Sequence, residues 1–149
     1  MLEHFPFKFK EFNITGNDIP EIVATKILIY HILPAVLVRV QLGMPIWPSL
    51  NSCWRPYYWE IQNSRDGGSQ HCFGQDKYGN FDRDSKGACD WACGEFNGNK
   101  ELLLQALIDN TDYTRFGIYG SFIHCDYKKT SSGKRQVYNH MWEKQYIIK

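Results

Sequence analysis

Two parts of the chain hold the residues best suited to chemistry. The first is Ser69–Gly74, which reads Ser-Gln-His-Cys-Phe-Gly and is completed by Gly87–Asp90. The second is Phe122–Asp126, which reads Phe-Ile-His-Cys-Asp. Together they offer two histidines and a carboxylate, and three such protein ligands leave the fourth tetrahedral position of Zn²⁺ open for water. If they converge, the pattern predicts a hydrolytic metal site rather than a closed structural one.

His124 lies in a predicted strand, two residues before Asp126. Residues two apart on a strand point to the same face, so these two side chains share one face while Ile123 and Cys125 share the other. The pair suits a metal ligand with a neighbouring base or supporting carboxylate. It equally suits an ordinary His–Asp pair. His71 lies in a polar loop, where burial as a core histidine is less expected.

The composition predicts one domain, residues 1–149. Hydrophobic residues make up 43% of the chain and charged residues 22%, which is ordinary for a globular protein long enough to bury a core. The net charge of +1 argues against a nucleic-acid partner, and we expect a monomer. The aromatic share of 15% fits either a cleft for an extended polar ligand or core packing.

The N-terminal residues 1–12 mix polar and aromatic side chains, which predicts synthesis in the cytoplasm without a signal peptide. The most apolar segment, 27–40, is interrupted by His31, Pro34 and Arg39, and we expect a core helix too short to span a membrane. Five cysteines are an odd number, so one at least stays outside any intramolecular disulfide. Without export, reduced thiols are expected.

Local signals predict an α+β domain with helices first and mainly antiparallel strands afterwards. Asp18, Pro20 and Glu21 mark a helix start, Pro34 a kink, and Gly43 a helix end. The remaining expected elements are a strand at 46–52, a loop at 64–84, a helix at 99–108, and strands at 115–119, 121–127 and 136–142.

The order of the motifs resembles the zinc D-alanyl-D-alanine carboxypeptidases and related peptidoglycan peptidases, which share their fold with the Hedgehog signalling domain. The small single-domain members from bacteria and phages are the most similar branch. That family carries Ser-x-His-x-x-Gly-x-Ala-x-Asp and later Phe-Val-His-x-Asp, which the motifs above match in order. Pro45-Ile46 and Ser52–Arg55 also resemble the two ends of the family's first strand. The implied fold has helices packed on the sheet and the metal site in a cleft.

The resemblance implies one catalytic zinc ion held by His71, Asp90 and His124. It implies that Arg55 holds a substrate carboxylate or carbonyl, a task that suits the guanidinium fork. An ion pair of Arg55 with Glu60 or Asp66 is the alternative. Ser69 is expected either to position the substrate or to cap its loop.

The implied activity is hydrolysis of peptidoglycan stem peptides, at a D-Ala-D-Ala bond by a carboxypeptidase or at an L-Ala-D-Glu bond by an endopeptidase. Without a signal peptide, this suits a phage lysin or a virion-associated lytic enzyme that acts on the cell wall. The alternative is a non-catalytic module on the same fold that binds cell wall or protein. A structural phage protein with a vestigial site would bind no metal.

The chain departs from the family by an insertion of 12 residues, 75–86, so that His71 and Asp90 stand nineteen positions apart. Loop insertions whose ends stay close cost little free energy. Within it, Asn80, Asp82 and Asp84 alternate like the oxygen ligands of a calcium loop, but the following glycine and closing glutamate are missing. We expect a solvated acidic loop over the active site rather than a Ca²⁺ site.

A second departure concerns the general base. Many family members carry Glu or Asp three residues before the last histidine, where this chain has Ser121. Asp126 is the replacement expected from same-face geometry, and Asp112 is a weaker candidate.

The cysteines offer a rival metal site. Cys72, Cys89 and Cys93 could hold a structural zinc or form a disulfide, although we expect them to be small buried residues.

Overall fold

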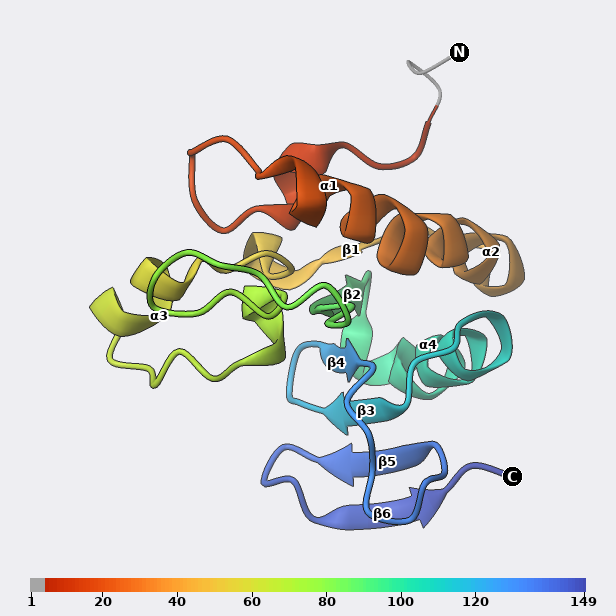
Figure 1. Ribbon diagram of the computed structural model, residues 1–149. Coiled ribbons are helices and arrows are strands. Elements are labelled where there is room, and N and C mark those ends of the chain that lie inside the picture. The colour runs from red at the N-terminus through yellow and green to blue at the C-terminus, as the bar shows by residue number, and fades with distance from the viewer. Residues whose placement is uncertain (1–4) are drawn as a thin grey trace.

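The computed structural model describes residues 5–149, in which six strands form one mixed sheet (Figure 1). The strands are β1 (Ile46–Pro48), β2 (Ala88–Cys93), β3 (Arg115–Ile118), β4 (Ile123–Asp126), β5 (Gln136–Asn139) and β6 (Lys144–Ile147). Their order across the sheet is β1-β2-β4-β3-β5-β6, and all neighbours are antiparallel except β3 and β5, which are parallel. The α+β class predicted from the sequence is confirmed.

Four α-helices accompany the sheet: α1 (Glu21–Ile27), α2 (Leu33–Leu42), α3 (Tyr57–Gln62) and α4 (Phe96–Asn110). A π-helical turn, Leu28–Ile32, joins α1 to α2, and short 3-10 helices occupy Phe9–Phe12, Ser49–Asn51 and Gln70–Cys72. Helix α2 packs against α4, which in turn packs against β2. The buried core is built from residues of these helices and of the sheet.

Pro34, where the sequence predicts a kink or a division, does not divide the long helix. It lies in the first turn of α2, directly after the π-helical turn. Because proline has no N–H, the carbonyl of Tyr30 four residues earlier loses its helical partner. The Tyr127 hydroxyl donates to that carbonyl at 2.6 Å, so the oxygen stays paired. Gly43, in the left-handed region at φ 71°, ends the helix as predicted.

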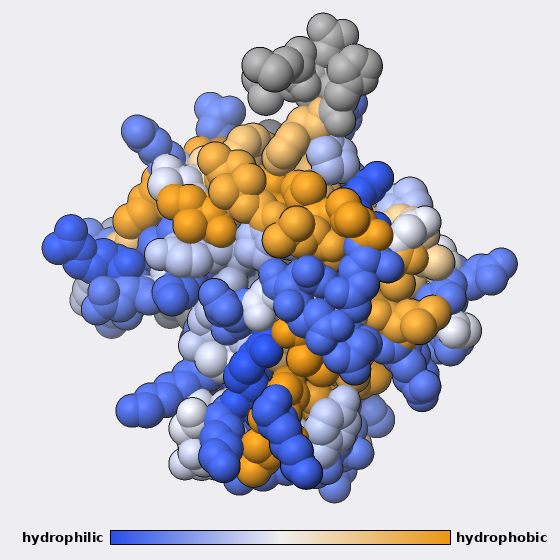
Figure 2. All heavy atoms as spheres, turned by 90° about the vertical axis from the view of Figure 1, so that its right-hand side faces the viewer, coloured by the Kyte–Doolittle hydropathy of each residue, from blue (hydrophilic) through white to orange (hydrophobic). Residues whose placement is uncertain are grey.

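The segment Glu21–Leu42 is 22 residues long and contains an 18-residue window with a mean hydropathy of 1.7, so by length and composition it could cross a membrane. The expectation of a segment too short to span is therefore wrong about its length. The prediction of a core helix holds for one face of this helix, whose side chains Val23, Ile27, Ile32, Ala35 and Val38 are buried. The other side is exposed: Figure 2 shows apolar side chains gathered on this part of the surface, and Leu33, Leu37 and Val40 are 51%, 55% and 75% exposed.

Several element boundaries differ from those predicted. Strand β1 ends at Pro48 and continues as a 3-10 turn, and α4 begins three residues earlier than expected. Strand β2 was not foreseen, because all six of its residues are buried and a fully buried strand lacks the alternation of apolar and polar residues. Helix α3 and strand β6 were also missed. Both are short, and all four residues of β6 are exposed.

Candidate metal centre

His71 is positioned by a tight turn at the end of the polar loop. It occupies the middle of the 3-10 helix Gln70–Cys72, whose N-terminus is capped by the Ser69 side chain accepting the His71 N–H at 3.1 Å. The Arg55 N–H donates to the His71 carbonyl at 2.9 Å, which joins this turn to the segment after β1. Phe73 and Gly74, both at positive φ, then turn the chain away. Ser69 thus has the capping role, the second of its two predicted roles.

Asp90 and His124 come from the centre of the sheet. They are Cα partners on the antiparallel strands β2 and β4, and opposite residues of such a pair project to the same face. His124 and Asp126 also share this face, as the spacing predicts. Ile123 and Cys125, which alternate with them, belong to the buried core. Both sheet ligands are buried, at 6% and 8% exposed for Asp90 and His124.

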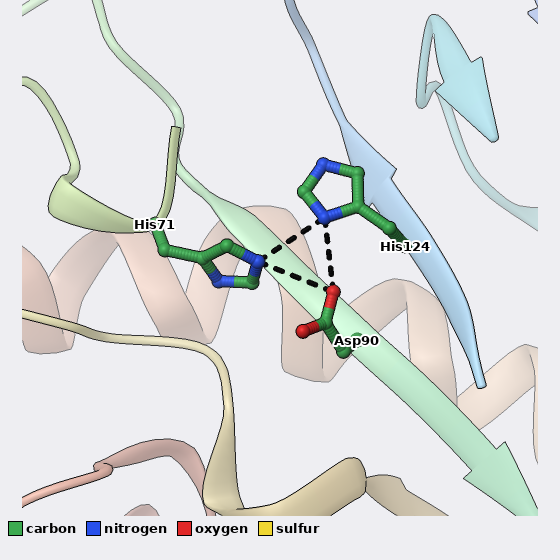
Figure 3. Close-up of side chains that lie close together, drawn as sticks. All are labelled: His71, Asp90 and His124. Atoms are coloured by element: carbon green, nitrogen blue, oxygen red, sulfur yellow. Dashed lines mark hydrogen bonds and ion pairs between the residues drawn. The ribbon is translucent and has the colours of Figure 1, made fainter. Parts of the chain in front are cut away.

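The three predicted ligands meet at one point, as Figure 3 shows. Asp90 Oδ1 lies 3.2 Å from His71 Nε2 and 2.9 Å from His124 Nδ1, and the two histidine nitrogens are 3.1 Å apart. Across residues 5–149, this is the one group of three His, Cys, Asp or Glu side chains whose ligand atoms come together, within 4.8 Å. A buried His71–Asp90–His124 group that could hold a metal ion is therefore present.

The other nitrogen of each ring already has a hydrogen-bond acceptor. His71 Nδ1 lies 2.9 Å from the Cys53 carbonyl, and His124 Nε2 lies 2.8 Å from Asp126 Oδ2. A carbonyl or a carboxylate can only accept, so these nitrogens carry the protons of the neutral rings and leave His71 Nε2 and His124 Nδ1 as lone pairs. Two lone pairs and a carboxylate oxygen thus converge, and this arrangement requires a cation between them, either a proton or a metal ion.

Without a metal, a proton on His124 meets this requirement. Burial lowers the pKa of His124, but hydrogen bonds to Asp126 and Asp90 outweigh it and raise that pKa to about 9. Burial lowers the pKa of His71, the deepest ligand at 1% exposed. Burial opposes ionisation of Asp90, yet the two histidines hold its pKa well below the usual range. The site is therefore built around an anionic Asp90 and one positive charge, which a divalent ion would replace.

Asp126 lies behind His124 rather than facing the ligand atoms. It is fully buried, and besides His124 it binds the guanidinium of Arg115, with Nε to Oδ1 at 2.9 Å and Nη2 to Oδ2. Burial would raise the pKa of Asp126, but the bonds from His124 and Arg115 hold it well below its usual range. Both carboxylate oxygens are thus occupied on the far side of the ring. This placement argues against Asp126 as the general base and gives it an orienting role.

The weaker candidate for the base, Asp112, does not lie beside the ligands either. Asp112 is exposed and lines a different cavity, together with Tyr127 and Lys129. Ser121 is exposed in the turn between β3 and β4. Neither Asp126 nor Asp112 is therefore placed to act as the general base.

Arg55 does reach the site. It lines both cavities that border the ligands, of about 320 and 350 Å³, and is 8% exposed. The predicted alternative, an ion pair with Glu60 or Asp66, is not found among the described residues, because Glu60 pairs with Arg65 at 3.4 Å. Arg55 Nε is buried without a hydrogen-bond partner, and its guanidinium lies over the Trp59 ring at 5.8 Å. Because this guanidinium forms no ion pair among the described residues, it is available to bind an anionic or carbonyl ligand.

The insertion 75–86 lies away from the ligands. Its backbone closes on itself between Gln75 and Phe81, Phe81 packs on Trp54, and Lys26 of α1 donates to the Asp82 carbonyl at 2.9 Å. None of its residues lines the two cavities beside the ligands, so the expected loop over the active site is not seen there. The Asp82 carboxylate accepts a hydrogen bond from the Asp84 N–H, as in a turn, rather than forming part of a group of Ca²⁺ ligands.

The cysteines do not form the rival metal site. All five are buried and free, and Cys72, Cys89 and Cys93 do not bring their sulfur atoms together. Cys72 lies 3.8 Å from the Glu60 carboxylate, and burial raises its pKa to about 12, so it stays a thiol. The prediction of small buried cysteines describes them correctly.

Three residues that line the site were not assigned to it from the sequence. Arg115, Tyr119 and Trp142 line the same cavity as His71 and His124. The signal was present for two of them, because 115, 117 and 119 alternate along a predicted strand and so share a face. Trp142 follows β5, and the sequence indicated only that it is one of several aromatic residues among polar ones, which could line a cleft or fill the core.

Comparisons with models of known protein families, with curated proteins and with solved structures returned no match. The chemistry of the site is therefore inferred from its own geometry.

Proposed function

We propose that this protein is a zinc-dependent peptidase of the cell-wall type, on a fold of the Hedgehog/DD-peptidase kind. The observation that carries the proposal is the convergence of His71 Nε2, Asp90 Oδ1 and His124 Nδ1, with the opposite ring nitrogens already engaged. The donor set of two imidazoles and one carboxylate suits zinc, and three protein ligands are the number found at catalytic sites. The residues present therefore fit the metal that the resemblance implies.

Each neighbouring side chain has a defined task in this proposal. A bound zinc ion supplies Lewis acidity, which polarises a carbonyl and makes water a better nucleophile at neutral pH. Asp126 and Arg115 hold the His124 ring in orientation, and the Cys53 carbonyl does the same for His71. Arg55 binds a carboxylate or carbonyl of the substrate. The substrate is a peptidoglycan stem peptide, cut at a D-Ala-D-Ala or an L-Ala-D-Glu bond, in keeping with a phage lysin.

One observation favours a second candidate, a non-catalytic binding module. Among the described residues that line the two cavities beside the ligands, Asp90 is the one carboxylate, and it is itself a ligand. A site without a free carboxylate lacks the usual acceptor for the proton of an attacking water. The same metal group would then hold the fold together and support recognition of the cell wall.

The test combines metal analysis with hydrolysis. The purified protein is expected to bind one zinc ion per chain and to release new amino groups from peptidoglycan, and His124→Ala is expected to lose both properties. His140→Ala is the matched control, because His140 is exposed in the turn after β5. Zinc at one equivalent without any released amine would support the binding module instead. No zinc at all, or full hydrolysis by His124→Ala, would refute the peptidase.

A further inference from the structure

Tyr119 is the one tyrosine among the described residues that line the two cavities beside the ligands. It lines both of these cavities. With Asp126 engaged by His124 and Arg115, and with Asp90 acting as a ligand, neither carboxylate of the neighbourhood is free. The Tyr119 phenol is therefore the most acidic O–H group among the residues that line the two cavities, since the others are serine hydroxyls.

The position of the Tyr119 ring follows from a missing side chain. Gly117 is the Cα partner of His124 on β3, so a side chain there would project beside the histidine. A Cβ built on Gly117 would lie 3.1 Å from Trp142 Cη2 and 3.4 Å from Tyr119 Cε2. The two aromatic rings thus fill the space that glycine leaves open, next to a metal ligand.

The ring is held on two sides by other aromatic groups. Tyr119 stacks on Phe122 at 4.6 Å between ring centroids, with an interplanar angle of 13°. Trp142 packs edge-to-face against Tyr119 at 6.4 Å and against His124 at 5.3 Å. The Tyr119 N–H donates to the Phe122 carbonyl at 3.0 Å, which closes the turn between β3 and β4. Such packing fixes the ring before a substrate arrives, so little reorganisation is needed.

The hydroxyl keeps its proton at neutral pH. Burial raises the pKa of Tyr119 above its ordinary value of 10.0 and outweighs a hydrogen bond with Trp142, which acts in the opposite direction. A protonated phenol donates a hydrogen bond, and donors aimed at the place where negative charge develops stabilise the transition state of amide hydrolysis.

We propose that Tyr119 is a catalytic residue of this site, whose hydroxyl donates a hydrogen bond to the carbonyl oxygen of the scissile amide as negative charge develops on that oxygen. The proposal rests on the peptidase function proposed above. The Tyr119 hydroxyl stays protonated throughout: water oxygen adds to the carbonyl carbon, the carbon–nitrogen bond breaks, and the water protons end on the carboxyl and amine products.

The experiment compares Tyr119→Phe with Tyr146→Phe, a half-exposed tyrosine on β6, outside the two cavities beside the ligands. The bond cut by the wild-type protein is first identified by mass spectrometry of digested peptidoglycan. For Tyr119→Phe, kcat on that peptide is expected to fall about 100-fold, while KM and zinc content stay within twofold of wild type. Tyr146→Phe should match the wild type in all three.

A second measurement does not depend on turnover. A phosphinate analogue of the cleaved peptide mimics the tetrahedral transition state, and its affinity for the zinc-loaded protein is measured by calorimetry. Tyr119→Phe should weaken phosphinate binding by about the factor lost in kcat, because the same hydrogen bond is missing in both. An active wild type with unchanged kcat and phosphinate affinity in Tyr119→Phe would overturn the role of Tyr119 alone. A wild type that releases no peptide would overturn the peptidase function itself.

Discussion

Asp126 and His124 are joined by a 2.8 Å hydrogen bond on the side of the imidazole that faces away from the other two ligands. The carboxylate therefore fixes which ring nitrogen carries a proton, and the free lone pair points toward Asp90. The carboxylate in turn is fixed by the Arg115 guanidinium from the next strand. The candidate metal centre thus depends on a chain of three side chains, of which only His124 is a ligand.

This relationship predicts that Asp126→Asn lowers zinc affinity rather than abolishing chemistry. Loss of such a supporting group typically costs about 10- to 100-fold in metal affinity. Affinity is measured by competition with a chromophoric chelator, and Asp112→Asn serves as the exposed control. Hydrolysis at saturating zinc should recover in Asp126→Asn. Unchanged zinc affinity with lost hydrolysis would instead identify Asp126 as the general base.

The two arginines of the site should affect stability very differently. Arg115→Met leaves the fully buried Asp126 carboxylate without its guanidinium, and breaking a buried pair from one side costs about 3 to 5 kcal/mol. Arg55→Met removes a buried guanidinium whose Nε has no hydrogen-bond partner and puts an apolar side chain in its place, so we expect less destabilisation than in Arg115→Met. Urea unfolding of the metal-free variants gives both values. Equal destabilisation would show that Arg55 has a structural ion pair after all.

Gly117 should not accept a side chain. Gly117→Val would press on the Trp142 and Tyr119 rings, and overpacking of this kind typically costs about 1 to 3 kcal/mol. Gly120→Ala is the control, because a Cβ at that position meets nothing within 4 Å. Thermal unfolding separates the two variants. A stable Gly117→Val would mean that the aromatic wall can move aside.

The burial of His31 predicts that the free energy of unfolding decreases in acid. Its ring is fully buried between the Tyr113 hydroxyl at 2.6 Å and the Lys86 carbonyl at 2.8 Å, and burial lowers its pKa from 6.5 to about 3. Between pH 3 and 6.5 the unfolded chain binds a proton at this histidine that the folded chain does not. The free energy of unfolding therefore rises with pH across this window, and stability is lost as pH falls, by at most roughly 5 kcal/mol from this group.

The measurement is urea unfolding of the wild type and His31→Gln at a series of pH values, with chelator present to exclude metal effects. The variant is expected to be less stable near neutral pH and to show a shallower dependence between pH 3 and 6.5. Parallel curves would show that His31 does not titrate as its burial implies.

The sequence was sufficient to predict the ligands but not their surroundings. His71, Asp90 and His124 were assigned together because the order of their motifs resembles that of the zinc peptidases, whereas strand alternation alone placed only His124 and Asp126 on one face. Asp126 was assigned to the correct face, yet its role changed once Arg115 was seen to hold it from a neighbouring strand. Cross-strand pairing depends on register, which the pattern did not specify, because β2 is buried throughout and shows no alternation.

The helical prediction illustrates the same limit. Pro34 signals a break by its own chemistry, since it lacks an N–H and clashes with the preceding turn. The structure keeps the helix continuous through a π-helical turn and the Tyr127 hydroxyl, which comes from a segment 97 positions away in the chain. A hydrogen bond between residues so far apart in the chain cannot be predicted from a short stretch of sequence. The aromatic wall of Tyr119 and Trp142 was missed for the same reason.

The ligands come from two kinds of structure, because Asp90 and His124 belong to paired strands while His71 belongs to a 3-10 turn at the end of a loop. A metal ion would therefore act as a cross-link between a rigid half of the site and a half that is held by fewer backbone bonds. Amide hydrogens around residues 69–74 should exchange with solvent more slowly after metal loading, whereas those of β2 and β4 should change little. Metal occupancy would thus set the local stability of the loop that carries His71.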